Sequence, residues 1–286
     1  MSASLRPVGS DDTYTKWLEV GDRCFVRRYE YFDVSCSVVL GEAGALVVDT
    51  RASLAQGQEL ASHVRELTPL PVRAVVNTHV HFDHLFGNGA FAGVPIIAHE
   101  SVPLELTSHD AQIKGWYEAE PDDTNREAAL TTVVVPPDVV FSSVWAVDLG
   151  DRHVELAHLG RGHTAGDIVV RVADADVVCA GDLVEESPHP SYGSDCYPLE
   201  WGSTLESLSE LLGPATVVVP GHGRAADKDF VLQQRLDVVD VAEQIRELAT
   251  AGASVDDAVR RGRWPYPGED LRDAISRGFA QSAPAR

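Results

Sequence analysis

Basic residues are scarce in this sequence of 286 residues. Lysine and arginine together number 23 against 44 aspartates and glutamates, which gives a formal net charge of -21 at pH 7. A surplus of negative charge this large repels phosphate backbones. We therefore expect a small-molecule substrate and no nucleic acid partner.

Cysteine is also rare, and its four copies form no C-x-x-C pair. Cys24, Cys36, Cys179 and Cys196 lie mostly in apolar segments typical of strands. A free cysteine in such a segment behaves as a small hydrophobic residue. We expect buried thiols rather than a disulfide framework or a cysteine-based zinc site.

Long apolar runs are missing as well. The longest stretch without Asp, Glu, Lys or Arg runs from His84 to His99 and contains two histidines, an asparagine, three glycines and a proline. A bilayer crossing needs about 20 apolar residues, so we expect no membrane partner. The segment from Met1 to Trp17 lacks the apolar core of a secretory signal, which predicts a cytoplasmic location. The oligomeric state stays open, a homo-oligomer included.

Short apolar segments do alternate with helical patterns along the chain. Strands are predicted at 24–30, 34–40, 45–49, 72–77, 144–148, 153–159, 167–172, 176–180 and 216–219, and helices at 54–67, 203–212, 230–250 and 254–261. The polar segment 101–137 reads as helices and loops, either a lid or a connector, and the loop 186–197 is expected to border the active site. We predict one domain over 1–286, with 224–286 as a helical extension that covers it.

The motif Thr-His-Val-His-Phe-Asp-His occupies positions 78–84, directly after a predicted strand. His79 and His81 are two residues apart, so in an extended stretch their rings emerge on one side and can share a metal ion. Asp83 and His84 are then available to a neighbouring ion. Solvent-exposed loop histidines are the alternative reading of this motif.

Further ligand types follow other predicted strands beside glycine, where the backbone can approach an ion closely. His163 lies in Gly-His-Thr-Ala-Gly-Asp, Asp182 follows Gly181, and His222 lies in Pro-Gly-His-Gly. A metal site needs such additional ligands.

With these motifs in this order, the sequence from about Val34 to Gly223 resembles the metallo-β-lactamase superfamily. The resemblance implies an α+β fold, a four-layer αβ/βα sandwich of two mixed β-sheets packed face to face with helices outside. Carried over by position, it implies that His79, His81 and His163 hold one metal, that Asp83, His84 and His222 hold a second, and that Asp182 bridges both. Two zinc ions are the expected cofactors, with iron or manganese as alternatives. The bridging Asp182 resembles the glyoxalase II and lactonase type more than the β-lactamases.

Other residues are expected to lie around the ligands. Asp49 and Asp167 are candidates for orienting the ligating imidazoles, and His189 and Tyr192 are candidates for substrate contacts. The cluster Arg260, Arg261 and Arg263 could grip glutathione, as basic residues of glyoxalase II helices do, or be an ordinary basic surface.

The resemblance implies a zinc-dependent hydrolase that uses a metal-bridging hydroxide to cleave an ester, thioester or lactone. Asp83 is the expected catalytic residue, which passes a proton to the departing group. Three alternatives stay open: a mononuclear iron enzyme like the persulfide dioxygenases, whose ligands correspond to His79, His163 and Asp182; a β-lactamase; and a metal-binding protein of the same fold without turnover.

Overall fold

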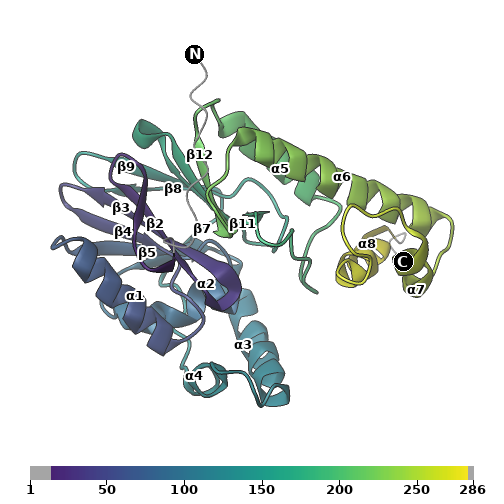
Figure 1. Cartoon of the computed structure of the whole chain (residues 1–286), viewed down its shortest axis with the longest axis horizontal. Helices are drawn as coiled ribbons and strands as arrows, with labels where there is room; N and C mark the ends of the chain where they lie inside the picture. The colour runs from purple at the N-terminus through teal and green to yellow at the C-terminus, as the bar shows by residue number, and fades with distance from the viewer. Residues whose placement is uncertain (1–13, 283–286) are drawn as a thin grey trace.

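The computed structural model describes residues 14–282. The strands of this part of the chain form one continuous 12-stranded β-sheet that folds into two halves (Figure 1). The first half contains β1 (Leu18–Gly21), β2 (Cys24–Tyr29), β3 (Val34–Gly41), β4 (Gly44–Val48), β5 (Val72–Val76), β6 (Ile96–His99) and β7 (Val139–Phe141). The second half contains β8 (Val144–Asp148), β9 (His153–Ala157), β10 (Val169–Val172), β11 (Val177–Glu185) and β12 (Val217–His222). The order is β7-β6-β5-β4-β3-β12-β11-β10-β9-β8, with β2 also paired to β3 and β1 paired to β2.

The two halves meet where β12 pairs with β3, through His222 and Val34. Because His222 is a predicted metal ligand, one candidate ligand lies at the seam between the halves.

The halves pack face to face and carry helices on their outer faces. A central cluster joins Val48 and Val76 of the first half to Leu156 and Cys179 of the second. Outside the first half lies α1 (Leu54–Leu67), and outside the second lie α5 (Trp201–Leu211) and α6 (Lys228–Thr250). Burial of these apolar faces is the main stabilising contribution. The predicted four-layer α+β sandwich is thereby confirmed.

Local sequence signals explain the helix α1. Ser53 caps its N-terminus by accepting a hydrogen bond from the backbone N–H of Gln56, and the buried residues Leu60, Ala61 and Val64 recur at helical spacing. The helix spans the predicted residues 54–67. The four cysteines are free and buried, as predicted.

The polar segment after β6 is more regular than the sequence suggested. It contains the long helix α3 (Val102–Ala119) and the short helix α4 (Arg126–Thr131). The strands β1, β6 and β7 and the helix α8 (Arg272–Ser282) were not predicted. They are short or follow weak apolar patterns, so pairing with neighbouring elements decides their structure.

The C-terminal helices extend the second half of the molecule sideways. Helices α7 (Val255–Arg261) and α8 lie at the far end of α6, beside the sandwich rather than over it (Figure 1). The loop 186–200 is tied to this region, since His189 contacts Asp270 and Arg277 donates to the carbonyl of Cys196. Among the described residues, no helix combines the length and apolarity that crossing a bilayer requires.

The remaining short elements border the candidate site or close turns. They are η2 (Tyr31–Asp33), α2 (Phe82–Leu85), η3 (Phe86–Phe91) and η4 (Ala173–Ala175).

Candidate metal centre

The histidine motif leaves the end of β5 and enters α2. His81 is the residue before the first turn of α2, while Asp83 and His84 lie within that turn. The change from extended to helical backbone directs the side chains of the motif to two adjacent places.

The first group of ligand atoms comes from His79, His81, His163 and Asp182, which all lie within 4.8 Å of one another. Nε2 of His163 is 2.7 Å from Nδ1 of His81. Oδ2 of Asp182 lies 3.3 Å from Nε2 of His163 and 3.6 Å from Nε2 of His79. The motif and the loop after β9, far apart in sequence, therefore converge on one point.

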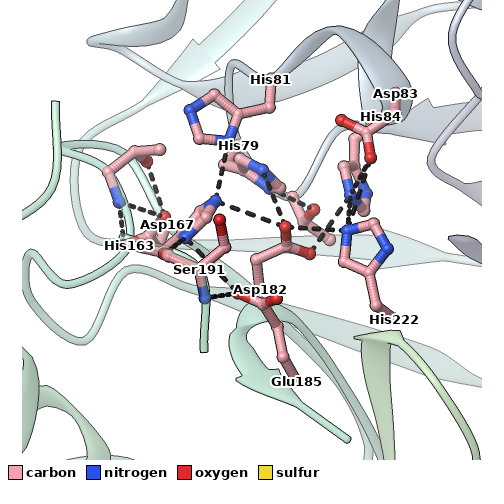
Figure 2. A network of polar contacts seen from close by, with 12 residues as sticks. His79, His81, Asp83, His84, His163, Asp167, Asp182, Glu185, Ser191 and His222 are labelled. Carbon is pink, nitrogen blue, oxygen red and sulfur yellow. Dashed lines mark hydrogen bonds and ion pairs between the residues drawn. The ribbon is translucent and has the colours of Figure 1, made fainter. Parts of the chain in front are cut away.

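The second group comes from Asp83, His84 and His222. Nε2 of His222 lies 3.4 Å from Oδ2 of Asp83 and 3.3 Å from Nε2 of His84. Asp182 also reaches this group, with Oδ2 at 3.1 Å from Nε2 of His222 and Oδ1 at 3.2 Å from Nε2 of His84. Figure 2 shows the Asp182 carboxylate between the two groups.

The position of Asp182 depends on an irregularity in β11. The pairing with β12 shifts register between Cys179 and Gly181 and again before Glu185, and Gly181 adopts a positive φ of 53°. A bulge of this kind re-aims the following side chain. Asp182 thus lies inside the nine-residue strand β11, whereas the sequence suggested that it follows the end of the strand.

Each candidate ligand imidazole has one ring nitrogen that faces the surrounding chain and forms a hydrogen bond there, and we call it the outer nitrogen. The other ring nitrogen, the inner nitrogen, faces the centre of the site. The outer partners are Thr78 Oγ1 for His79 (3.0 Å), Asp195 for His81 (3.0 Å), Asp49 for His84 (2.8 Å), the Ser191 carbonyl for His163 (3.0 Å) and the Phe32 carbonyl for His222 (2.7 Å). Because Thr78 Oγ1 donates to Asp49, it can accept from His79. An outer N–H that donates leaves the lone pair of the inner nitrogen free for a ligand.

These residues fit a pair of divalent cations. The inner nitrogens face one another and two carboxylates, and both His79 Nε2 and Asp182 Oδ1 are buried without a hydrogen-bond partner among the described residues. Unpaired buried polar atoms are costly. Mixed nitrogen and oxygen donors are those that zinc, iron and manganese bind in proteins.

The electrostatics of the cluster favour bound positive charge. Burial lowers the pKa of His79, and burial together with the neighbouring His81 lowers that of His163 to about 4. Burial alone would raise the pKa of Asp182, but His222 and the other imidazoles around it hold that pKa well below its usual range. At His222, burial is outweighed by Asp182, and the pKa rises to about 10. An anionic carboxylate among buried imidazoles attracts either protons or a cation that replaces them.

The two residues proposed to orient imidazoles occupy different positions. Asp49 contacts Nδ1 of His84 and accepts hydrogen bonds from the N–H and hydroxyl of Thr78. The Asp167 carboxylate accepts hydrogen bonds from the N–H and hydroxyl of Thr164, and the Asp167 backbone carbonyl contacts Nδ1 of His158, which belongs to neither ligand group. The carboxylate therefore orders the turn that carries His163.

The residues proposed for substrate contact lie outside the pocket wall. His189 stacks on Tyr266 and contacts Asp270. Tyr192 is buried against Trp201. Neither lines the pocket beside the ligands, whose wall in this loop comes from Ser187, Pro188, Ser191 and residues 193–195. Their substrate contacts stay predictions without support from this geometry.

Three other residues next to the ligands were not predicted from the sequence. Asp195 holds the outer nitrogen of His81, and His109 of α3 stacks on the His81 ring at 5.0 Å and accepts a hydrogen bond from the N–H of Phe82. Glu185 is buried, lies 3.7 Å from Nδ1 of His163 and accepts from the N–H of Ser191. The one available signal was that Asp195 belongs to the loop 186–197.

Comparisons with known proteins point to one superfamily. The model of the metallo-beta-lactamase superfamily matches residues 30–222. A metallo-beta-lactamase type 2 of Bacillus cereus is 27% identical over 191 residues, which are 66% of this chain and 66% of that protein. An acyl-coenzyme A thioesterase, MBLAC2, of Gallus gallus is 26% identical over 161 residues, 54% of this chain and 57% of that protein. The chain thus spans 66% or less of the length of these relatives.

Solved structures share the fold. The sec-alkyl sulfatase PisA1, solved as a double mutant, aligns with a TM-score of 0.73 at 16% sequence identity. The alignment covers 93% of this chain and 50% of the sulfatase chain.

Proposed function

The chain belongs to the metallo-beta-lactamase superfamily, and on this premise we propose that it is a binuclear metallo-hydrolase that cleaves an ester, thioester or lactone. The observation that carries the proposal is the Asp182 carboxylate, which contacts imidazoles of both ligand groups. The acyl-coenzyme A thioesterase among the relatives supports acyl transfer to water as the reaction class.

The proposed chemistry divides between the ions and the chain. Divalent ions bound here, zinc in our proposal, would lower the pKa of a bound water to about 7 and polarise an acyl oxygen. Each ion would be held by three residues of its own, and both ions would share Asp182. The residues are His79, His81 and His163 for one ion and Asp83, His84 and His222 for the other. The partners of the outer nitrogens keep each imidazole in the required tautomer, so little reorganisation accompanies the reaction.

Asp83 is the proposed proton carrier of the chain. It lines the pocket, and its Oδ2 lies within 3.6 Å of both His84 and His222. This position supports a role in which the carboxyl group passes a proton to the departing alcohol or thiol.

A substrate panel on metal-analysed protein tests the proposal. We expect zinc-loaded protein to hydrolyse p-nitrophenyl esters, thioesters or simple lactones with a higher kcat/KM than nitrocefin. His79→Ala should abolish this activity, whereas His153→Ala, a histidine on the exposed side of β9, should not. Oxygen consumption with glutathione persulfide in a protein that contains one iron would overturn the proposal, and so would a β-lactam as the best substrate.

A further inference from the structure

The pocket beside the candidate metal centre has one apolar wall. Phe32 of η2, Phe82 of α2 and Ile113 of α3 line it. The rings of Phe32 and Phe82 meet edge to face at 5.3 Å, and Trp116 of α3 lies 6.4 Å from each of them. Phe32 and Trp116 are 42% and 40% exposed, so this apolar surface is open to a substrate that packs on it.

The other wall carries negative charge. Glu185 and Asp195, from β11 and the loop after it, line the pocket in addition to the carboxylates Asp83 and Asp182 of the ligand groups. Burial and the neighbouring Asp182 raise the pKa of Glu185 to about 8, so Asp195 is the charged carboxylate of this wall outside the ligand groups.

Two cations of the surrounding elements are already engaged. Lys114 of α3 forms an ion pair with Asp110 at 2.9 Å. Arg277 donates to the carbonyl of Cys196, and its guanidinium stacks over Tyr197. A carboxylate on a substrate in the pocket would therefore meet Asp195, which lines it, and neither of these two cations.

We propose that this site selects an acyl group that is apolar and uncharged, and that it discriminates against an acyl group that carries a carboxylate. The apolar wall of Phe32, Phe82 and Ile113 packs against the acyl chain, and the Asp195 carboxylate repels a carboxylate on the acyl group. The inference rests on the proposed hydrolase function.

A matched pair of esters measures the selectivity. p-Nitrophenyl crotonate and mono-p-nitrophenyl fumarate have trans acyl chains of equal length, and only the fumarate ends in a carboxylate, which its trans double bond keeps from attacking the ester. We divide the ratio of their kcat/KM values by the ratio of their hydroxide-catalysed rates and expect the result to favour the crotonate by about tenfold or more at low salt. Added salt should reduce this preference, because salt screens the repulsion between charges at the exposed end of the pocket.

Charge variants separate pocket electrostatics from the overall charge of the protein. Gln112→Lys adds a cation to an exposed pocket position on α3 and should lower the preference for the crotonate several-fold. Gln233→Lys makes the same change on the exposed surface of α6 and should leave the preference unchanged.

The outcomes distinguish this inference from the proposed function. Equal corrected rates for both esters, or a preference that Gln112→Lys and Gln233→Lys change alike, would overturn the selectivity while the hydrolase remains. Hydrolysis of neither ester by metal-loaded protein would overturn the proposed function, and the selectivity with it.

Discussion

Replacing Asp195 should weaken metal binding although Asp195 is not itself a ligand. Its Oδ2 accepts a hydrogen bond from Nε2 of His81 at 3.0 Å, and this bond turns Nδ1 of His81 toward His163. In Asp195→Ala the imidazole loses this partner, so its tautomer and orientation are no longer held. His109, stacked on the other side of the ring, restrains the ring plane but not the tautomer.

The expected loss of metal affinity in Asp195→Ala follows from the number of ligands that the substitution affects. Loss of the partner of one ligating imidazole typically lowers metal affinity about 10- to 100-fold, or roughly 1.4 to 2.7 kcal/mol. The other imidazoles keep their outer partners Thr78, Asp49, Ser191 and Phe32. We therefore expect the loss at one ion only. Asp195→Asn keeps an oxygen acceptor and should recover part of the affinity.

Competition with a chromophoric chelator measures this change in zinc affinity, and the visible spectrum of the cobalt-loaded protein reports the altered ligand field. Asp270→Ala is the matched control, because Asp270 contacts His189 of the same loop at 3.1 Å and no candidate ligand. A zinc Kd for Asp195→Ala within twofold of the unmodified protein, with an unchanged cobalt spectrum, would show that Asp195 does not hold His81 in its ligating orientation.

Two other substitutions test the site and the core. A Cβ at Gly221 would overlap Oδ1 of Asp182, so Gly221→Ala should reduce the amount of bound metal while the circular dichroism spectrum stays unchanged. Gly115→Ala, where a Cβ meets open space, is the control and should keep its metal. Elemental analysis compares the metal content of the two variants. Trp201 is fully buried, so Trp201→Ala should lower the free energy of unfolding by about 3 to 5 kcal/mol in urea denaturation. Trp145→Ala, at an exposed position on β8, should change it by about 0.5 kcal/mol or less, and equal losses would contradict the assigned core.

The parts of the fold with strong local signals were predictable from the sequence. Helix α1 has a capping serine and a regular apolar stripe, and the structure places it over the predicted residues. The motif at positions 78–84 gathers its ligand types within a few residues, so their proximity needed little tertiary information.

Other features depend on contacts between distant segments and left no local signal. Asp182 follows Gly181 and resembles a strand end, but pairing with β12 carries the strand on to Glu185. Asp195 reaches His81 only because the loop 186–200 is fixed by the C-terminal region. His189 turns toward Asp270 for the same reason, and so the sequence could not show which residues of this loop line the pocket.

The number of metal ions bound per chain, measured by elemental analysis on three proteins side by side, shows whether two ions share Asp182. Asp182 contacts both ligand groups, while His222 belongs to the second group alone. We predict about two equivalents in the unmodified protein, about one in His222→Ala and less than one in Asp182→Ala. One equivalent in the unmodified protein, or equal losses in the two variants, would contradict a binuclear centre shared through Asp182.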